Sequence, residues 1–534
     1  MSNNLAARLQ ENADRFPEKP ALIIPGSRHS WKTVTYHQLN ERSRLFANGL
    51  CSYGVRLGTR AVLMAPPSVD FFALVFALLQ TGIVPVMLDP AIGLRNVRHC
   101  LADAEPEVYF GSTLTHAIRL LFGWGKDSLR LNLSLPDLAR AGASASEFQP
   151  LAVLPESEAA IVYTSGSTGL PKGVIYTHAN FAAQIEMLVK TLQLHGDEVD
   201  LPAFPLFALI DCLLGVTAII PDLRFPAPAR VNPARLAAAI QHQKVDTMFA
   251  SPAALDRLAR YGVKNKIKLE SLKKIISAGA PAPVPVQKMF RRLLLDEAEL
   301  FGVYGSTETL PVSTVNSHVV LTETSYLSEQ GAGICIGRPV EGAQVRIIPI
   351  HDGIIPQWHT ALNLPVGVVG EITVKGAAVT ELYVGQEKAT LLAKIRDADN
   401  AIVHRMGDLG YFDEKGRLWY CGRKSHRVLT ATETLFTESV EGIFNSHPQV
   451  FRSALVGVVQ AGITVPVLWI QMTSDSRAAD QNQLRVELLR LAKAHKSTQS
   501  IQTILFHPAF PTDIRHNSKI IREKLAELAK KSLK

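Results

Sequence analysis

The chain has 534 residues, 47% of them hydrophobic and 19% charged, with a formal net charge of +8. This composition is that of a globular protein and excludes a largely disordered chain, while the length exceeds one ordinary core and predicts two or more domains. The basic stretches at 257–274 and 519–534 carry only one aromatic residue between them, so nucleic-acid binding is not expected. Solvated helix faces are the simpler interpretation, and peripheral contact with an anionic membrane or an acidic partner is the alternative.

The five cysteines are scattered along the chain and form no CxxC pair. This pattern predicts reduced, mostly buried thiols and a cytoplasmic protein. No cluster of cysteine and histidine residues in the sequence indicates zinc. The cysteines are Cys51, Cys100, Cys212, Cys335 and Cys421.

The N-terminal stretch 1–16 mixes charged residues with apolar ones at helical spacing, which predicts a surface helix rather than a signal peptide. The longest apolar stretch, 71–88, is interrupted by Gln80, Gly82 and Pro85. We therefore expect a buried helix followed by a buried strand there, and no membrane span.

Apolar strand-like runs alternate with helical patterns through the first part of the chain, which indicates a parallel α/β architecture. After Arg423 the pattern changes: strand-like runs at 454–458 and 467–472 precede a helical run at 483–493. This second pattern indicates a small α+β domain. The strands expected in the first part include 61–65, 83–88, 159–163, 246–250 and 274–277.

The stretch 164–173 reads TSGSTGLPKG and lies between a strand-like run and a helix-like run. Its glycines leave the backbone open, so that amide N–H groups can approach phosphate oxygens, and its hydroxyl groups and one lysine add donors and a positive charge. Leu170 and Pro171 occupy positions that exclude a Walker A loop. A polyphosphate site is predicted, and a plain Gly/Ser surface loop is the alternative. The candidate phosphate-binding residues are Thr164, Ser165, Gly166, Ser167, Thr168, Gly169 and Lys172.

Further short motifs follow in order: Tyr304-Gly305-Ser306-Thr307-Glu308, 370–376, Gly407-Asp408 with Gly422-Arg423, and Lys519-Ile520. Together with 164–173, these motifs resemble the signature of the adenylate-forming enzymes, which include acyl-CoA synthetases, luciferases and peptide-synthetase adenylation domains. The resemblance covers nearly the whole chain. It implies a large N-terminal α/β domain, 1–422, with parallel and mixed sheets and flanking helices, and a small mobile C-terminal lid, 423–534, with its hinge near Ser425. It also implies ATP and Mg²⁺ as cofactors.

The resemblance assigns roles to individual residues. Lys519 would stabilise the α-phosphate together with the substrate carboxylate, although a lysine on a basic surface helix is the alternative. Glu308 would bind Mg²⁺, and Thr164 completes the catalytic set. Thr307 would bond the α-phosphate and Tyr304 would flank the adenine, although a polar turn is the alternative there.

The remaining nucleotide contacts are also implied by the resemblance. Asp408 would accept hydrogen bonds from the ribose hydroxyls, and Arg423 would donate to the ribose or to a phosphate. The loop that includes Gly279, Ala280 and Pro281 would lie behind the adenine and the acyl pocket, and Gly305 and Ser306 would complete the nucleotide site. Three histidines, His178, His404 and His426, are expected to be structural rather than catalytic.

Three positions depart from the pattern of the CoA-forming relatives: Thr432 and Ser518 replace glycines, and Ala208 replaces a histidine. A β-branched residue narrows a passage for the pantetheine arm of CoA. The segments 510–520, 201–205 and 220–222 instead resemble the β-lactone synthetases of the bacterial long-chain olefin pathway. In those relatives a 3-hydroxy fatty acid is adenylated, and its own hydroxyl group then closes a β-lactone.

Three functional hypotheses follow. The first is β-lactone formation from a 3-hydroxy fatty acid, in a lipid pathway with other enzymes. The second is a medium- or long-chain acyl-CoA synthetase, or an acyl-AMP ligase, acting on a fatty acid. The third is an inactive nucleotide-binding scaffold. Asp513 and His516 are guesses for the group that deprotonates the hydroxyl. Phe204 and Phe207 are expected to serve core packing or substrate contact equally well.

Overall fold

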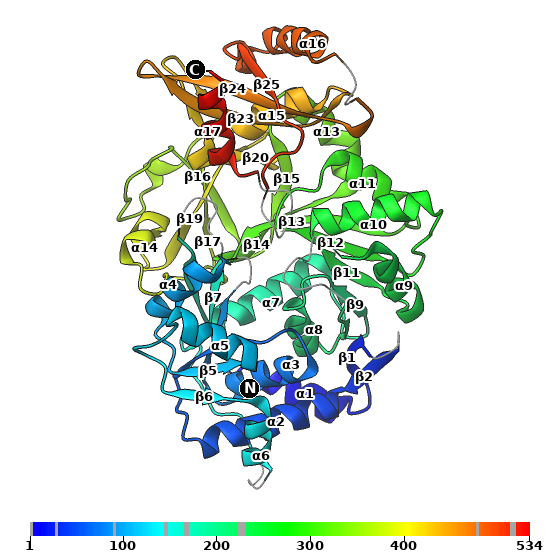
Figure 1. The fold of residues 1–534 in the computed structure, drawn as a ribbon, viewed down its shortest axis with the longest axis vertical. Helices are drawn as coiled ribbons and strands as arrows, with labels where there is room; N and C mark the ends of the chain where they lie inside the picture. Colours follow the sequence, from blue (N-terminus) through cyan, green and yellow to red (C-terminus); the bar gives the residue numbers. More distant parts are fainter. Residues whose placement is uncertain are drawn as a thin grey trace.

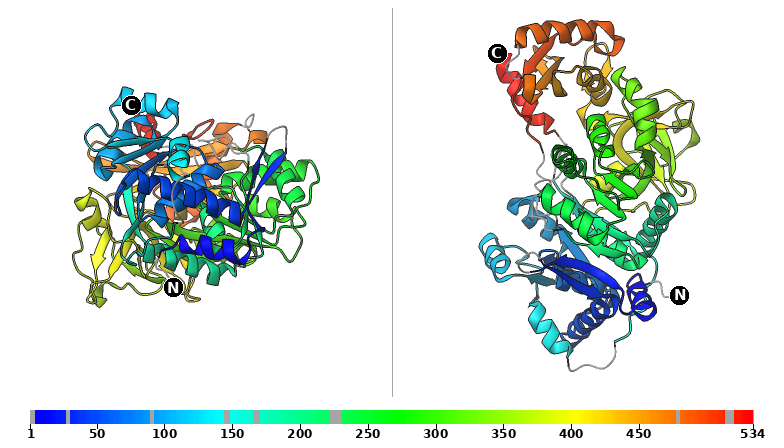
Figure 2. Two further views of the ribbon diagram at one scale, coloured as in Figure 1. Left: turned by 90° about the horizontal axis from the view of Figure 1, so that it is seen from below. Right: turned by 90° about the vertical axis from the view of Figure 1, so that its right-hand side faces the viewer.

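The computed structural model describes residues 4–26, 30–88, 92–143, 148–164, 170–221, 231–476, 480–512 and 520–533. Sheets flanked by helices follow one another along the long axis of the molecule, with the N-terminal third at the bottom of Figure 1 and the C-terminal segment at the top. The side view in Figure 2 shows the same order.

The first sheet has the strand order β6-β5-β3-β4-β7-β8. Its neighbours are parallel except for β7 and β8, which are antiparallel. The expected strands at 61–65, 83–88 and 159–163 are confirmed as β3, β4 and β7. The bounds are β3 (Arg60–Met64), β4 (Val84–Leu88), β5 (Val108–Gly111), β6 (Leu131–Leu133), β7 (Glu158–Thr164) and β8 (Lys172–Thr177).

The second sheet has the order β16-β17-β19-β20-β15-β14-β13-β12-β11-β9-β10-β1-β2, with β18 paired to β19. The strands from β1 to β13 are parallel neighbours, and those from β13 to β16 are antiparallel. The parallel α/β prediction is therefore confirmed, with an antiparallel extension. The bounds are β1 (Pro20–Pro25), β2 (Trp31–Thr35), β9 (Val199–Pro202), β10 (Thr217–Ile219), β11 (Thr247–Ala250), β12 (Lys274–Ala278), β13 (Glu299–Ser306), β14 (Thr309–Asn316), β15 (Ile334–Pro339), β16 (Gln344–Ile348), β17 (Gly370–Lys375), β18 (Lys394–Arg396), β19 (Ile402–Phe412) and β20 (Leu418–Arg423).

The helices of this part mostly begin at a serine, threonine or asparagine whose side chain accepts a hydrogen bond from the first turn, as at Thr35, Ser68 and Thr177. These caps fix where each helix leaves the sheet. The bounds are α1 (Ala7–Arg15), α2 (Tyr36–Ser52), α3 (Val69–Gln80), α4 (Leu94–Ala104), α5 (Thr113–Phe122), α6 (Leu135–Gly142), α7 (His178–Leu192), α8 (Phe207–Leu214), α9 (Pro233–Gln243), α10 (Pro252–Lys264), α11 (Val284–Arg291), α12 (Ser317–Val319), α13 (Ser325–Glu329) and α14 (Glu387–Ala393).

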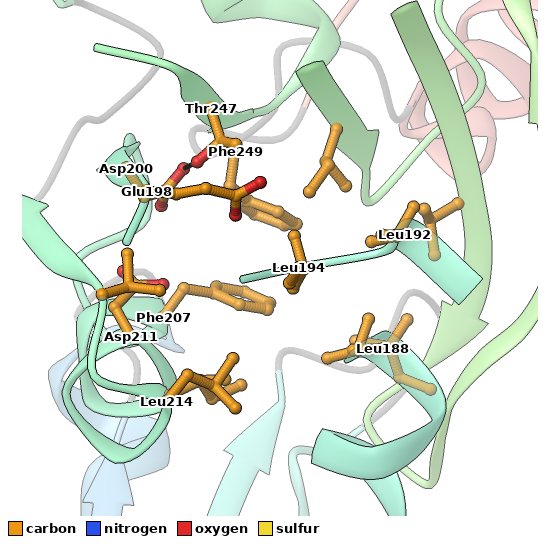
Figure 3. A pocket seen from close by; sticks show the side chains of 15 residues that line it. Leu188, Leu192, Leu194, Glu198, Asp200, Phe207, Asp211, Leu214, Thr247 and Phe249 are labelled. Atoms are coloured by element: carbon orange, nitrogen blue, oxygen red, sulfur yellow. Dashed lines mark hydrogen bonds between the residues drawn. The ribbon is translucent and has the colours of Figure 1, made fainter. Parts of the chain in front are cut away.

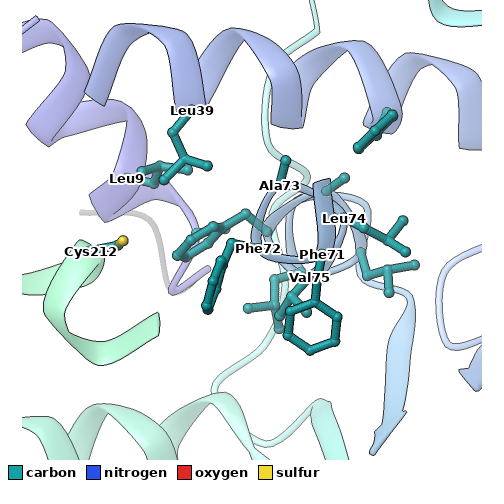
Figure 4. Packing of buried hydrophobic residues seen from close by; sticks show 14 of the residues in the cluster. Leu9, Leu39, Phe71, Phe72, Ala73, Leu74, Val75 and Cys212 are labelled. Atoms are coloured by element: carbon teal, nitrogen blue, oxygen red, sulfur yellow. The ribbon is translucent and has the colours of Figure 1, made fainter. Parts of the chain in front are cut away.

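Helix α3 lies inside the protein, and every residue from Phe71 to Gln80 is buried. Figure 4 shows Phe71, Phe72 and Leu74 packed among neighbouring helices. The prediction of a buried helix followed by a strand at 71–88 is confirmed. None of the helices in the described ranges has both the length and the apolar character that a membrane crossing needs.

After Arg423 the strands pair only with one another among the described residues: β21 with β22, and β24 with β23 on one side and β25 on the other. The strand-like runs at 454–458 and 467–472 and the helical run at 483–493 are confirmed. The domain boundary at 422/423 stays a prediction. The bounds are β21 (Val428–Leu429), β22 (Thr434–Leu435), α15 (Thr437–Asn445), β23 (Val450–Gln460), β24 (Ile463–Met472), α16 (Gln481–Ala494), β25 (Thr503–Phe506) and α17 (Arg522–Ser532).

The expectation of mostly buried cysteine thiols is met. All five are free, with Cys51 exposed and the other four buried. Burial raises the pKa of the Cys100 thiol to about 12. These buried thiols are inert packing groups.

Candidate active site

The predicted phosphate-binding segment connects two antiparallel strands. Strand β7 ends at Thr164, β8 begins at Lys172, and these two residues are register partners. Residues 165–169 and the side chain of Thr164 lie outside the described part, so their phosphate contacts stay a prediction. The Lys172 ammonium, at the end of this segment, lies 4.9 Å from the ring centre of Tyr383. This cation–π contact fixes the lysine side chain against Tyr383.

Glu308 lies in the turn between β13 and β14, and both its side chain and its backbone carbonyl accept hydrogen bonds. Its Oε1 accepts a hydrogen bond from the Tyr383 hydroxyl over 2.6 Å. Its backbone carbonyl accepts from the Thr380 N–H over 2.9 Å and from Thr380 Oγ1 over 3.2 Å. The adjacent Thr307 carbonyl accepts from the Tyr176 hydroxyl. The carboxylate therefore points in a fixed direction before any ligand is bound.

A buried lysine, Lys394, supports this arrangement. Its Nζ donates to the carbonyl of Thr380 and to Thr380 Oγ1, the residue that grips the Glu308 carbonyl. Burial lowers the pKa of Lys394 to about 7. Its ammonium also lies 5.8 Å from the ring centre of Tyr383, so both lysines, Lys172 and Lys394, contact that ring.

The surroundings keep Glu308 ionised. Burial alone raises the pKa of this carboxyl, but His404, the Tyr383 hydroxyl and Lys394 together lower it to about 2. Burial lowers the pKa of His404 itself to about 3, so that imidazole is neutral near pH 7. At neutral pH the Tyr383 hydroxyl therefore stabilises the carboxylate, and the positive charge of Lys394 adds to this as pH falls below about 7.

One carboxylate with a free oxygen suits Mg²⁺, which binds proteins through one or two carboxylates and completes its shell with water and substrate phosphates. Within the described ranges no group of three or more metal-ligating side chains gathers at one place, so an all-protein metal cage is not what this part of the chain offers. Glu308 Oε1 is engaged by Tyr383, and Oε2 is the oxygen that would hold the ion.

Asp408 and Arg423 are register partners on β19 and β20, as the predicted ribose pair requires. Arg423 Nε lies 3.1 Å from Asp408 Oδ1, and the Tyr304 hydroxyl donates to Asp408 Oδ2 over 2.7 Å. The Asp408 carboxylate raises the pKa of the Arg423 guanidinium. The structure thus brings Tyr304, Asp408 and Arg423 together. The predicted adenine contact of Tyr304 and the ribose contacts stay predictions.

The loop Gly279, Ala280, Pro281 follows β12 at the carboxyl end of the parallel strands. Gly279 has φ +91°, which a side chain would disfavour, so glycine lets the chain turn away from the strand here. Ligands of open parallel sheets bind at this edge. Gly305 and Ser306 end the neighbouring β13, so the structure places this loop and the Tyr304–Glu308 motif at the ends of adjacent strands.

Lys519 and the residues from Asp513 to Ser518 lie outside the described part, so the catalytic assignment stays a prediction. Thr512 and Ile520, the described residues on either side of these positions, form an antiparallel bridge. The buried Arg522 Nη2 donates to Glu441 Oε2 over 3.0 Å and connects α17 to α15.

The three histidines have structural surroundings. His178 and His404 are buried, and His404 Nδ1 lies 3.2 Å from the carbonyl oxygen of Ala393. Burial lowers the pKa of His178 to about 4. His426, next to the predicted hinge residue Ser425, lies 3.5 Å from Glu523. The buried, neutral imidazoles of His178 and His404 agree with the structural interpretation.

An apolar cavity of about 40 Å³ lies between the second sheet and helices α7 and α8 (Figure 3). Phe207 stacks on Phe249 in its wall, with ring centres 3.9 Å apart. Phe207 therefore lines a cavity, whereas Ala208, one residue further, is fully buried in the neighbouring core. The apolar wall includes Leu188, Leu192, Phe207, Phe249, Ile276 and Val303.

Sequence reasoning missed Tyr383, Thr380 and Lys394. Tyr383 lies 75 residues from Glu308, and none of the motifs contains it. A lysine between Ala393 and Ile395, in an otherwise apolar run, is the one signal that could have marked a buried cation.

Comparison with known proteins agrees with this geometry. The family model "AMP-binding enzyme" matches residues 9–384. The chain is 43% identical to an olefin β-lactone synthetase of Stenotrophomonas maltophilia (strain K279a), over 99% of this chain and 98% of that protein. It is 42% identical to an olefin β-lactone synthetase of Xanthomonas campestris pv. campestris, over 98% and 97% respectively.

Solved structures share the fold. ATP-bound MatB from Rhodopseudomonas palustris superposes with a TM-score of 0.80 at 22% identity, over 100% of both chains. O-succinylbenzoate coenzyme A synthetase from Bacillus subtilis, in complex with AMP, superposes with a TM-score of 0.77 at 21% identity, over 98% of both chains.

Proposed function

Because the chain belongs to the family of AMP-binding enzymes, and is thus an AMP-forming ligase, we propose that it activates a 3-hydroxy fatty acid with ATP and converts it to a β-lactone. The observation that carries this proposal is the near full-length identity of 43% and 42% to two olefin β-lactone synthetases. The site adds a candidate Mg²⁺ ligand, the carboxylate of Glu308 that Tyr383 orients, and two lysines, Lys172 and Lys394, that both contact the Tyr383 ring.

In the first step the substrate carboxylate attacks the α-phosphorus of ATP, and pyrophosphate leaves. The obstacle is repulsion between anions, so fixed cations and aimed donors lower the barrier. Lys172 lies at the end of the phosphate-binding segment, and Lys519 acts at the α-phosphate and the carboxylate. Glu308 would hold Mg²⁺, and the bound ion would supply positive charge to the phosphate oxygens.

The nucleoside binds between the ends of β12 and β13, which carry Gly279 and Tyr304, and the strands β19 and β20, which carry Asp408 and Arg423. Asp408 accepts from the ribose hydroxyls, and its carboxylate is already oriented by Tyr304 and Arg423. The loop Gly279–Pro281 and the Tyr304 motif enclose the adenine. This orientation is established before substrate binds, so less binding energy is needed to order it.

In the second step the 3-hydroxyl oxygen attacks the acyl carbonyl carbon, the bond from that carbon to the phosphate oxygen breaks, and AMP leaves. The hydroxyl proton passes to a base. The nucleophile is tethered to the electrophile, so no CoA site is needed. Thr432 lies exposed at the tip of the hairpin β21–β22, where its N–H donates to Thr430 Oγ1, and a β-branched residue there narrows a path for pantetheine.

The alkyl chain is proposed to begin at the apolar wall beside Ile276 and Val303, because this wall lies next to the loop that follows β12. The segment after Arg423 acts as the lid domain that carries Lys519 and rotates about Ser425. Its strands pair only among themselves in the described ranges, which supports a boundary at 422/423. Other enzymes of a lipid pathway are the proposed partners.

Exchange of labelled pyrophosphate into ATP tests the first step. We expect exchange with 3-hydroxy fatty acids and Mg²⁺, and with plain fatty acids of matching length, because both carry the attacking carboxylate. Absence of exchange across a broad series of both acids would contradict the adenylation step and favour an inactive nucleotide-binding scaffold.

A further inference from the structure

Helix α5 has apolar side chains on the side that faces solvent. None of its residues is buried. Leu114, Leu120 and Leu121 are 69%, 70% and 81% exposed. A surface helix of a globular protein normally has the opposite orientation, because burial of its apolar stripe is what holds it to the protein. Figure 1 shows α5 beside β5, on the outside of the first sheet.

The side of α5 that faces the sheet carries polar residues, which contact Tyr109 on β5. The ring of His116 lies 4.7 Å from the Tyr109 ring, and the guanidinium carbon of Arg119 lies 5.4 Å from the centre of the same ring. Ile118 is the apolar residue of this helix that packs on the buried cluster beneath it. The exposed leucines therefore contribute little to the attachment of α5, and packing within this chain does not account for them.

The exposed apolar residues of α5 form one continuous surface. Leu114, Ala117 and Leu121 have the spacing i, i+3, i+7 and so lie on one side of the helix, with Leu120 and Phe122 beside them. The Phe122 ring is 38% exposed and lies 5.9 Å from the ring of the buried Trp124. We call the five residues from Leu114 to Phe122 with exposed apolar side chains the α5 face.

The charges that accompany the α5 face are mainly positive. Helix α4 packs on the same buried cluster, and its exposed residues include Arg95 and Arg98 but no carboxylate. Lys126 is exposed shortly after the end of α5, which contains no acidic residue. Exposed carboxylates, Glu105 and Asp127, lie beyond the ends of the two helices. An occupant with negative charge at its surface and an apolar interior matches this pattern.

A lipid bilayer has this composition. Amphipathic helices with leucine and phenylalanine on one side and cations nearby bind in the plane of the headgroups, with the apolar side chains at the boundary of the acyl chains. A second copy of this chain fits less well. The α5 face offers on the order of 300 Å² of apolar surface, whereas a stable protein interface buries about 800 Å² on each partner.

We propose that the α5 face binds the surface of a membrane that contains anionic phospholipid. Its leucines enter the boundary between headgroups and acyl chains, and Arg95, Arg98 and Lys126 lie near lipid phosphates. This surface is separate from the nucleotide site, so its binding does not depend on the proposed function. Contact with a bilayer would bring the enzyme to the phase into which a long-chain acid and its lactone partition.

The test is flotation of the purified full-length protein with lipid vesicles, without ATP or acid. We expect the wild-type protein to float with vesicles that contain phosphatidylglycerol, and to do so less with phosphatidylcholine alone or at high salt. Leu121→Gln should weaken this binding roughly tenfold, because it removes an apolar side chain that the bilayer would bury. Leu114→Gln, near the other end of the helix, should act in the same direction.

Two further variants separate apolar contact from charge and from general effects. Arg95→Gln combined with Arg98→Gln should lose about fivefold for each arginine with phosphatidylglycerol vesicles, and should bind phosphatidylcholine as the wild-type protein does. Val486→Gln is the matched control, because Val486 is 57% exposed on α16, at the other end of the molecule in Figure 1. It should float as the wild-type protein does.

The proposal is overturned if the wild-type protein floats with neither vesicle, which would leave a protein as the occupant of the α5 face, or if Leu114→Gln and Leu121→Gln float as the wild-type protein does. It is also overturned if the wild-type protein sediments as a dimer without lipid and Leu121→Gln sediments as a monomer, because a second copy then covers this face. Absence of pyrophosphate exchange with every acid contradicts the proposed function alone, since flotation is measured without substrate.

Discussion

The hydroxyl group of Tyr383 donates a hydrogen bond to Glu308 Oε1 over 2.6 Å, while the ring of the same tyrosine lies 4.9 Å from Lys172 Nζ. One side chain thus connects the candidate metal ligand with the lysine of the phosphate-binding segment. Glu308 comes from the turn between β13 and β14, and Lys172 from the start of β8. Tyr383 contacts both and so connects the two sheets at this point.

Tyr383→Phe keeps the ring and its contact with Lys172 but removes the hydrogen bond to the carboxylate. A hydrogen bond to a charged group contributes about 1.5–3 kcal/mol, so we expect pyrophosphate exchange to fall by roughly ten- to a hundredfold. Calorimetry should also show a weaker dependence of ATP binding on Mg²⁺. Tyr411→Phe is the matched control, because its hydroxyl donates to the Ala332 carbonyl instead. Equal activity in the two variants would show that the Tyr383 hydroxyl does not orient Glu308.

Asp408→Asn tests the ribose site. The amide keeps the shape of the side chain and one acceptor oxygen, but it removes the negative charge that pairs with Arg423 and replaces one acceptor oxygen with a donor. We expect the KM for ATP to rise roughly ten- to a hundredfold, with a smaller change in kcat, because ribose contacts are made in the ground state and the transition state alike. A lowered kcat with an unchanged KM would instead place Asp408 in the chemical step.

Lys519→Ala tests the predicted catalytic lysine. We expect adenylate formation to fall by a factor of about 10²–10³ or more, while ATP binding stays nearly intact, because the charge acts mainly on the transition state. Rapid-quench measurement of acyl-adenylate and equilibrium binding of ATP separate the two effects. Unchanged turnover would identify Lys519 as a surface residue.

The buried carboxyl groups of Asp200 and Asp211 predict a pH dependence of stability. Between pH 3.8, the ordinary pKa of Asp, and about pH 6 in the folded protein, Asp200 binds more protons when folded than when unfolded. Its contribution to stability is therefore present below pH 3.8 and is lost as pH rises, and Asp211 extends this loss to higher pH. Each pKa unit corresponds to about 1.4 kcal/mol.

Asp211→Asn removes one of these two ionisable groups. The urea midpoint of the variant, relative to that of the wild-type protein, should therefore increase as pH rises from about 4 to about 8. A constant difference across this range would mean that burial does not raise the pKa of Asp211 in the folded protein.

The sequence predicted those features that depend on local pattern. The apolar stretch 71–88 specified α3 and β4, and the change of pattern after Arg423 specified the separate sheet of β23 and β24. Features that depend on long-range packing were not predictable. Tyr383 reaches Glu308 only because its segment packs beside β8, and Asp211 and Asp200 line the same cavity only because α8 packs against β9.

The central claim is that this enzyme closes a β-lactone without CoA. Purified enzyme with ATP, Mg²⁺ and a 3-hydroxy fatty acid should give AMP, pyrophosphate and a product lighter than the acid by one water, identified by mass spectrometry and by its lactone carbonyl absorption. Addition of CoA should change neither rate nor product, and a plain fatty acid should stop at the bound acyl-adenylate. A requirement for CoA, with acyl-CoA accumulating instead of lactone, would contradict the claim and identify an acyl-CoA synthetase.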